Sequence, residues 1–152
     1  MADERTPVLD RILELVAVLD ADSRTALARD GLTTARAHVL WELQHRGPLT
    51  QRALADALRV SARNVTGLVD GLVDGGFVTR EPHPGDRRAT LVSFTEHGAA
   101  TAARLEREHA ELARALFADL PEDRFRAFAD GLDHVLARLR DLGVSLDAQA
   151  ER

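Results

Sequence analysis

The stretch LTQRALADALRVSARNVTGLVDGLVDGGFVTREPHPGDRRATLVSFT, residues 49–95, decides the fold of this chain. It reads as a helix, a short turn, a second helix and a two-stranded hairpin. Thr50 follows a Gly-Pro-Leu sequence and precedes an Ala- and Leu-rich run, so we predict that it caps the first helix. Ser61 is the corresponding cap of the second helix. The stretch therefore predicts a helix-turn-helix followed directly by a β-hairpin.

The second helix of this stretch has one apolar face and one polar face. Its apolar positions recur at helical spacing: Val65, Leu68, Val69 and Leu72. At about 100° per residue, the positions that point away from this stripe are Arg63, Thr66, Gly67 and Asp70, with Asn64 on the flank. Such side chains can contact phosphates and base edges in a DNA major groove. Ordinary solvent-facing polarity is the competing interpretation, and it is the commoner one for an isolated helix.

The hairpin favours the DNA interpretation. Gly75-Gly76 is a helix stop, and residues 77–80 and 89–94 have strand composition. Between them, residues 81–88 contain two prolines and a glycine, which predict a stiff, exposed loop. Adjacent arginines at its tip suit a minor groove, whose negative potential attracts arginine. Asp86 beside them is predicted to hold one guanidinium through a charge-assisted bond.

These motifs together resemble the MarR family of winged-helix transcription regulators. The residues that carry the resemblance are Leu54–Leu58, Val60–Ser61, Val65–Leu72, Gly76–Arg80, Asp86–Ala89 and Leu91–Gly98. The Asp-Arg-Arg-Ala wing and the strand-Thr-x-x-Gly exit are specific for the family when they occur together. Phe94 is a departure, since leucine is the commoner residue there. The resemblance implies a homodimeric DNA-binding repressor, often released by a small molecule.

The flanking segments predict further helices. A Thr-Pro pair at residues 6–7 is a helix start, and an apolar stripe follows it toward Leu27. After the hairpin, Thr95 is predicted to cap a helix to about Ala118, and Pro121 to open a last helix to about Leu142. Because wide apolar faces come from both chain ends, we expect two subunits to share a helical bundle.

We therefore predict a mainly α fold with a small β-hairpin. It comprises a winged helix-turn-helix DNA-binding lobe and a helical dimerisation lobe built from both chain ends. Residues 1–152 form one MarR-like domain, in which residues 33–94 are the DNA-binding region. Residues 7–30 and 95–143 are the helical dimerisation region.

Composition sets limits on function. The 152 residues include no Cys, which excludes disulfides and cysteine redox sensing, and no apolar run approaches the ~20 residues of a membrane span. We expect a cytoplasmic protein without cofactor or metal. The net charge is −5, but residues 36–90 carry eight arginines against six acids, so the excess acid lies outside the DNA-binding region. All 20 basic residues are arginine, which favours bidentate phosphate and guanine contacts.

Nine candidate DNA-binding residues follow: Thr50, Gln51, Ser61, Arg63, Asn64, Thr66, Asp86, Arg87 and Arg88. Thr50 and Gln51 would bind phosphate at a helix N-terminus. Four candidates, Ser61, Arg63, Asn64 and Thr66, would read base edges in the major groove or position the helix there. The two wing arginines would enter the minor groove or hold its phosphates, and which of them enters the groove stays open.

A ligand pocket is a further possibility. His38 and Trp41 lie three residues apart on the helix before Gly47, so one face can present both. Core filling is the commoner role of a single tryptophan. The pocket interpretation gains support from the resemblance, since pockets of this family commonly lie between the dimer helices and the DNA-binding lobe. A phenolic or anionic effector would suit such a site.

Two other classes of function compete with the regulator. An enzyme would need a reactive constellation, yet the six histidines are scattered and no HExxH, phosphate loop or nucleophile motif occurs. A winged helix can also serve as a protein-interaction module without a specific operator. Such modules usually lack paired arginines at the wing tip.

Overall fold

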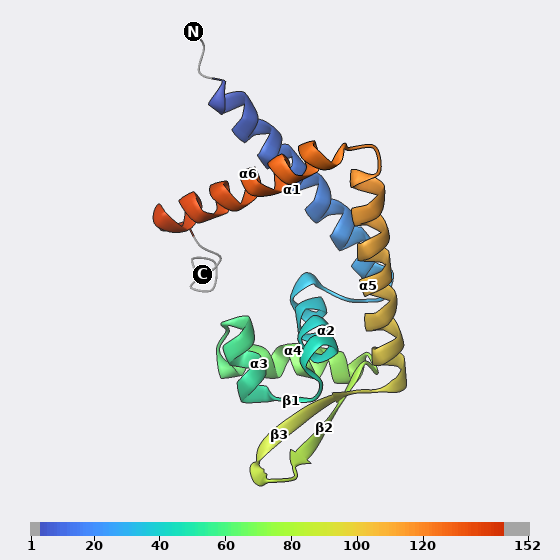
Figure 1. Cartoon of the computed structure of the whole chain (residues 1–152). Helices are drawn as coiled ribbons and strands as arrows, with labels where there is room; N and C mark the ends of the chain where they lie inside the picture. Colours follow the sequence, from blue (N-terminus) through green and yellow to red (C-terminus); the bar gives the residue numbers. More distant parts are fainter. Residues whose placement is uncertain (1–3, 145–152) are drawn as a thin grey trace.

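A computed structural model describes residues 4–144, and it forms two lobes joined by one long helix (Figure 1). The elements are α1 (Arg5–Ala28), α2 (Thr34–Arg46), β1 (Leu49–Thr50), α3 (Gln51–Leu58), α4 (Ala62–Asp74), β2 (Val78–His83), β3 (Asp86–Phe94), α5 (Glu96–Phe117) and α6 (Glu122–Asp141). The lower lobe holds α2, α3, α4 and the sheet, and α5 rises from it to the upper lobe with α1 and α6. The predicted mainly α architecture with a winged helix-turn-helix is confirmed.

Side-chain hydroxyls cap four of the helices, and the sequence predicts three of these caps, at Thr50, Ser61 and Thr95. Each accepts a hydrogen bond from the amide three residues on: Thr33 from Arg36 (3.3 Å), Thr50 from Ala53 (3.1 Å), Ser61 from Asn64 (3.1 Å) and Thr95 from Gly98 (3.0 Å). Each such cap is worth about 1 kcal/mol. The caps fix where α3 and α4 begin, and thus the angle of the helix-turn-helix.

The predicted start of the first helix is wrong. The helix α1 begins at Arg5, and the residue before it, Glu4, already has near-helical dihedrals and makes no side-chain cap bond. Pro7 is tolerated as the third helical residue because the first four amides of a helix have no intrahelical acceptor. Thr6 is therefore an ordinary helical residue rather than a cap.

The hydrophobic core lies in the lower lobe. Its fully buried side chains come from α2, α3, α4, β2 and β3: Val39, Leu40, Leu54, Val65, Val69, Leu72, Val78 and Val92. They include three of the four residues of the predicted apolar stripe of α4, and Leu68 packs against the same cluster partly buried. The orientation of α4 is thus fixed by burial of its own apolar face.

The sheet has three antiparallel strands in the order β1-β3-β2, where the sequence predicted only a hairpin. The two-residue strand β1 is too short to show a period in sequence. The predicted loop at residues 81–88 is also wrong, because strand pairing continues to His83 opposite Asp86 and leaves a two-residue turn. Pro82 does not stop the strand because β2 is an edge strand, where proline is tolerated.

A tight junction joins α4, β2 and α5. The Thr95 hydroxyl donates to the Gly76 carbonyl at 2.6 Å, and the Thr95 amide donates to the Phe77 carbonyl at 3.0 Å. Gly98 is buried against the Phe77 carbonyl, directly before β2, and an added Cβ would lie 1.8 Å from that oxygen. The first turn of α5 therefore requires glycine for close backbone approach.

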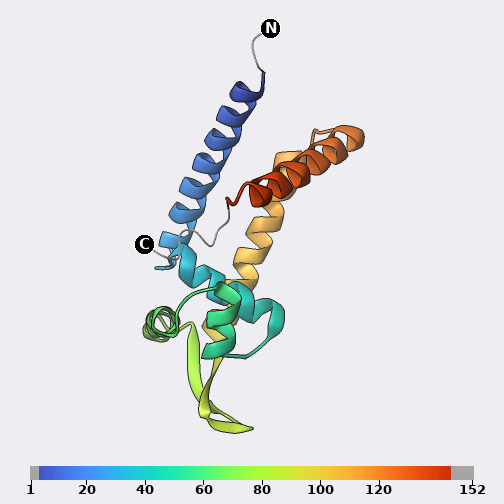
Figure 2. The same ribbon diagram turned by 90° about the vertical axis from the view of Figure 1, so that its left-hand side faces the viewer.

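The upper lobe exposes much of its apolar surface. Figure 1 shows α6 crossing α1, but in Figure 2, turned by 90°, the two helices stand apart. No described residue of α6 is buried, and Leu27 is the buried residue of α1. Leu13 and Val16 on α1 are 59% and 58% exposed. The core of the lower lobe therefore does not continue into the upper lobe of a single chain.

The Gly98 junction gives a stability prediction. Gly98→Ala forces a methyl group onto the Phe77 carbonyl, and we expect it to lower the free energy of unfolding by about 1–3 kcal/mol. Urea unfolding at fixed protein concentration measures this. Gly67→Ala is the control, because a Cβ at Gly67 of α4 meets nothing within 4 Å. That substitution should stabilise by about 0.5–1 kcal/mol, as alanine does over glycine in a helix. Equal effects of the two changes would contradict the close approach.

Candidate nucleic-acid interface

The exposed face of α4 is polar and begins directly after its cap. Arg63 and Asn64 are exposed, while Val65 and Val69 on the other side of the helix are buried. Ser61 already accepts the Asn64 amide, so its hydroxyl fixes the helix N-terminus. Among the candidates of this helix, Arg63 and Asn64 are the two whose side chains form no hydrogen bond or ion pair with another residue of the described range 4–144.

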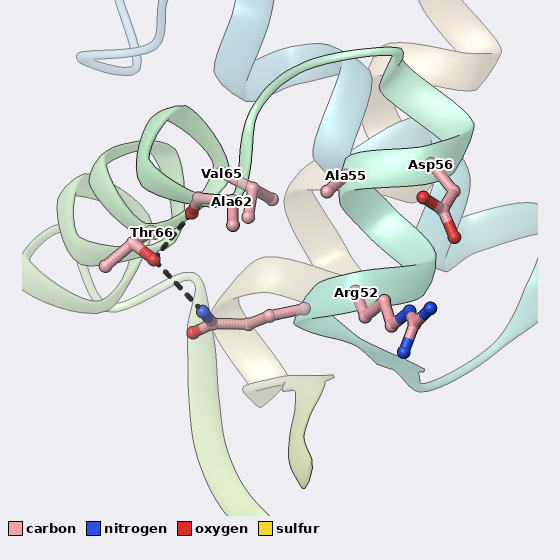
Figure 3. Close-up of a pocket in the computed structure, with 7 residues that line it drawn as sticks. Arg52, Ala55, Asp56, Ala62, Val65 and Thr66 are labelled. Carbon is pink, nitrogen blue, oxygen red and sulfur yellow. Dashed lines mark hydrogen bonds between the residues drawn. The ribbon is translucent and has the colours of Figure 1, made fainter.

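The candidates at the start of α3 are engaged within the protein. The Thr50 hydroxyl caps the helix, and the Gln51 amide donates from Nε2 to the Thr66 hydroxyl at 3.3 Å. Thr66 in turn donates to the Ala62 carbonyl at 2.8 Å (Figure 3). These contacts bring α3 and α4 together at the polar surface. Sequence reasoning placed these residues on polar helix surfaces but missed that Gln51 and Thr66 bind each other.

Arg80 on β2 is the main residue that sequence reasoning missed. Its Nε donates to Gln51 Oε1 at 2.7 Å, and one terminal nitrogen donates to the Thr66 carbonyl at 3.2 Å and pairs with Asp70 Oδ1 at 2.6 Å. A single guanidinium thus binds α3 and α4 from the base of the wing. The signal available in sequence was an arginine at the end of an expected strand, which does not reveal its partners.

The wing carries its charge at the end of the hairpin. Arg87 and Arg88 are exposed, and the hairpin projects from the lower lobe away from all helices in both views (Figures 1 and 2). Asp86 does not act as predicted, because its carboxylate accepts the backbone amide of Arg88 at 3.0 Å rather than a guanidinium. A bond of this kind shapes the turn, and it leaves both arginine side chains turned to solvent.

A hollow of about 380 Å³ opens between α3 and α4 (Figure 3). It is lined by Gln51, Arg52, Ala55, Asp56, Ala62, Val65 and Thr66. The predicted pocket residues His38 and Trp41 are not among them. Both are exposed, and Trp41 is 57% exposed, so it does not fill the core. The Trp41 ring lies 4.2 Å, centroid to centroid, from that of His45 on the same helix.

Polar contacts tie α5 to the lower lobe and to the loop after α1. Gln44 donates to Glu106 at 3.1 Å, and Arg104 donates to Asp30 at 2.7 Å and to Glu108 at 2.8 Å. The hydrogen bond to Asp30, followed by the one to Glu108, raises the pKa of Arg104 above its ordinary value. Arg104 therefore stays charged and holds α5 to the α1–α2 connection.

Other kinds of site find no support in the part of the chain that the structure describes. Residues 4–144 contain no cluster of three or more histidines and carboxylates suited to a metal ion. No helix within that range combines the length and apolarity needed to cross a membrane.

Known proteins share the central region of this chain. Residues 30–89 match the model of the MarR family. A Mycobacterium leprae protein named an uncharacterized HTH-type transcriptional regulator is 45% identical over 60 residues, which cover 40% of this chain and 42% of that protein. The HTH-type transcriptional repressor NicR of Pseudomonas putida is 38% identical over 69 residues, covering 45% and 44%. The chain thus spans less than half the length of these two relatives.

The similarity to solved structures extends over most of the fold. The structure of a mutant MarR from Escherichia coli complexed with operator DNA is 28% identical, with a TM-score of 0.66 over 88% of this chain and 96% of that one. Members of the family are transcription regulators rather than enzymes, which sets the enzyme hypothesis aside. Residues 30–89 build the helix-turn-helix and the first part of the wing, and on this evidence this region of the chain belongs to the MarR family of winged helix-turn-helix proteins.

Proposed function

We propose that this protein is a homodimeric transcriptional repressor that binds a palindromic DNA operator and is released by a small-molecule effector. The observation that carries the proposal is the exposed Arg63–Asn64 pair at the capped start of α4, combined with a wing whose two arginines face solvent. The named repressor NicR and the operator complex of MarR support the same function.

The candidate residues divide into two groups by their contacts. Arg63 and Asn64 would read base edges in the major groove, where arginine pairs with guanine and asparagine with adenine. Arg87 and Arg88 would reach the adjacent minor groove or its phosphates. The capped N-terminus of α3 behind Thr50 would add backbone amides for a phosphate. Gln51 and Thr66 would act mainly by fixing the two helices.

The apolar surface of the upper lobe supports the proposed dimer. At about 100° per residue, the apolar residues of α1 spread over more than half of its circumference: Val8, Leu9, Leu13, Leu15, Val16, Val18 and Leu19. A helix apolar on so many sides is normally enclosed by others. The apolar residues of α6 are exposed as well, with Leu136 at 50%: Phe125, Phe128, Leu132, Val135, Leu136 and Leu139. A second copy that packs α1 and α6 against its own would cover both faces.

The two-fold symmetry of this dimer then predicts the sequence symmetry and half-site spacing of the operator. In a C2 dimer the two α4 helices present the same residues in opposite directions, so the matching DNA is a palindrome. Its half-sites would lie about one helical turn apart, ~34–36 Å. The effector would act on this spacing. It shifts the equilibrium only if it binds one separation of the two reading helices better than another.

The exposed Trp41 and His38 are the residues we propose for the effector site. They lie on α2, the helix whose Gln44 binds α5 through Glu106. A phenolic or anionic molecule against them would contact α2, which this hydrogen bond ties to α5, the helix that joins the two lobes. The aromatic ring offers a stacking surface, and the imidazole a hydrogen bond.

DNA recognition predicts distinct effects for the two arginine positions. We expect wild-type protein to prefer its own upstream intergenic DNA over unrelated DNA of equal length at ~150 mM salt. Arg63→Ala should weaken that binding by about tenfold or more, because a base contact is worth about 1–3 kcal/mol. Arg88→Ala should weaken binding to both DNAs and lower the salt slope by about one.

Fluorescence anisotropy at several salt concentrations measures both quantities. Arg124→Ala on α6, which is exposed and far along the chain from the interface, is the control and should bind as wild type does. Equal, weak binding of wild type to both DNAs would instead favour the protein-interaction module.

The dimer predicts opposite outcomes for two neighbouring positions of α6. Leu136→Glu buries a carboxylate in the proposed interface, so we expect sedimentation velocity to show a monomer at concentrations where wild type is a dimer. His134→Glu places the same group on the opposite face of the helix, at about 100° per residue, and should stay dimeric. A monomeric wild type, or a dimeric Leu136→Glu, would exclude this interface.

A further inference from the structure

Arg80 stands where the wing leaves the body of the protein. In the sheet it lies opposite Val92, which in turn lies opposite Leu49, so this row crosses all three strands. One more row completes the three-stranded part of the sheet. In it Leu91 of β3 lies between Glu81 of β2 and Thr50 of β1. Beyond it β2 and β3 continue alone to the turn. Arg80 therefore sits at the base of a two-stranded arm.

The side chain of Arg80 reaches both helices of the helix-turn-helix. Its acceptors are Gln51 on α3, at 2.7 Å, and the Thr66 carbonyl and Asp70 on α4, at 3.2 and 2.6 Å. Gln51 also donates to the Thr66 hydroxyl, so the contacts close into one network. We call this network of Arg80, Asp70, Gln51 and Thr66 the wing clasp.

The geometry of the arm makes its base important. At ~3.3 Å per residue, the turn lies roughly 10–13 Å beyond the last three-stranded row. A rotation of the arm at its base is therefore enlarged at Arg87 and Arg88. Because two strands alone form a marginal structure in water, the arm depends on its base for a fixed direction.

We propose that the wing clasp sets the angle between the wing and α4, so that major-groove and minor-groove contacts are made together. Arg80 and Asp70 are positioning residues in this scheme, and Gln51 aligns the guanidinium. This inference rests on the proposed DNA-binding function and adds the device that couples its two reading elements. The planar fork of arginine suits the task, since it can satisfy three acceptors in fixed directions.

The clasp contributes little to global stability. The Asp70 side chain is 55% exposed and that of Arg80 is 29% exposed, and ion pairs at such positions are weak. Loss of the clasp should therefore change the melting temperature by no more than about 4 °C. The change in wing direction should be the larger effect.

Asp70→Asn gives a test whose sign separates positioning from plain electrostatics. Removing an anion close to DNA should by itself strengthen binding. The clasp predicts the reverse, a loss of specific affinity of at least fivefold at ~150 mM salt. Asp74→Asn is the matched control, because Asp74 is exposed one turn further along the same helix. It should bind DNA as tightly as wild type or slightly more tightly.

Two changes at Arg80 separate positioning from direct phosphate contact. Arg80→Lys keeps the charge but lacks the planar fork, and Arg80→Met lacks both. If Arg80 acts as a positioning residue, both variants lose specific affinity to a similar extent. Retention of wild-type affinity by Arg80→Lys, or binding by Asp70→Asn as tight as that of wild type, would overturn the proposal.

Amide hydrogen exchange of the full-length protein without DNA supplies a readout independent of the proposed function. Exchange at residues 81, 83 and 86–90 should be at least fivefold faster in Asp70→Asn and Arg80→Met than in wild type, and unchanged in Asp74→Asn. Unchanged wing exchange in both clasp variants would refute the clasp. Faster exchange, combined with a wild type that shows no DNA preference, would instead refute the proposed function and leave the clasp standing.

Discussion

Burial of the apolar stripe of α4 is the constraint on which the rest of the structure depends. Val65, Val69 and Leu72 are almost completely removed from solvent, and each such side chain contributes roughly 1.5–3 kcal/mol relative to an exposed one. Burial of this stripe fixes the rotation of α4 about its own axis. Arg63 and Asn64 then face outward because no other face is left for them. The exposure of the polar face of α4 is thus a consequence of core packing and needs no additional interaction.

Backbone contacts transmit this arrangement to the sheet and to α5. The Thr95 amide and hydroxyl bind the carbonyls of Phe77 and Gly76, and Gly98 lets the first turn of α5 lie directly on the Phe77 backbone. Arg104 then fastens α5 to the loop after α1. Because these contacts are short and directional, a movement of α5 is coupled to the lobe that carries α4. Under the proposed function, these contacts are the route by which an event in the upper lobe would reach bound DNA.

The upper lobe follows a different logic. Its helices carry apolar stripes of the ordinary kind, yet residues 4–144 leave much of their surface uncovered. Several exposed leucines and valines on α1 alone represent a large unfavourable hydration free energy. The surface that the lower lobe buries by folding is, in the upper lobe, available for association. Folding and dimer formation would accordingly be linked, and stability would depend on protein concentration.

Sequence by itself determined the elements and their local ends. The hydroxyl caps at Thr50, Ser61 and Thr95, the stripe of α4, the glycine stops and the basic wing are encoded over a few residues each, so spacing and side-chain chemistry suffice to find them. The family resemblance came from the same motifs.

Only the tertiary structure decided what requires contacts between distant residues. A two-residue strand such as β1 exists because β3 pairs with it, and Pro82 stays in a strand because that strand is at the edge of the sheet. The partners of Arg80 lie 10 to 29 positions away, with Gln51 the most distant, and no local pattern records them. The same reason explains why Gln51 and Thr66, chosen as DNA contacts from their place on a helix face, prove to bind each other.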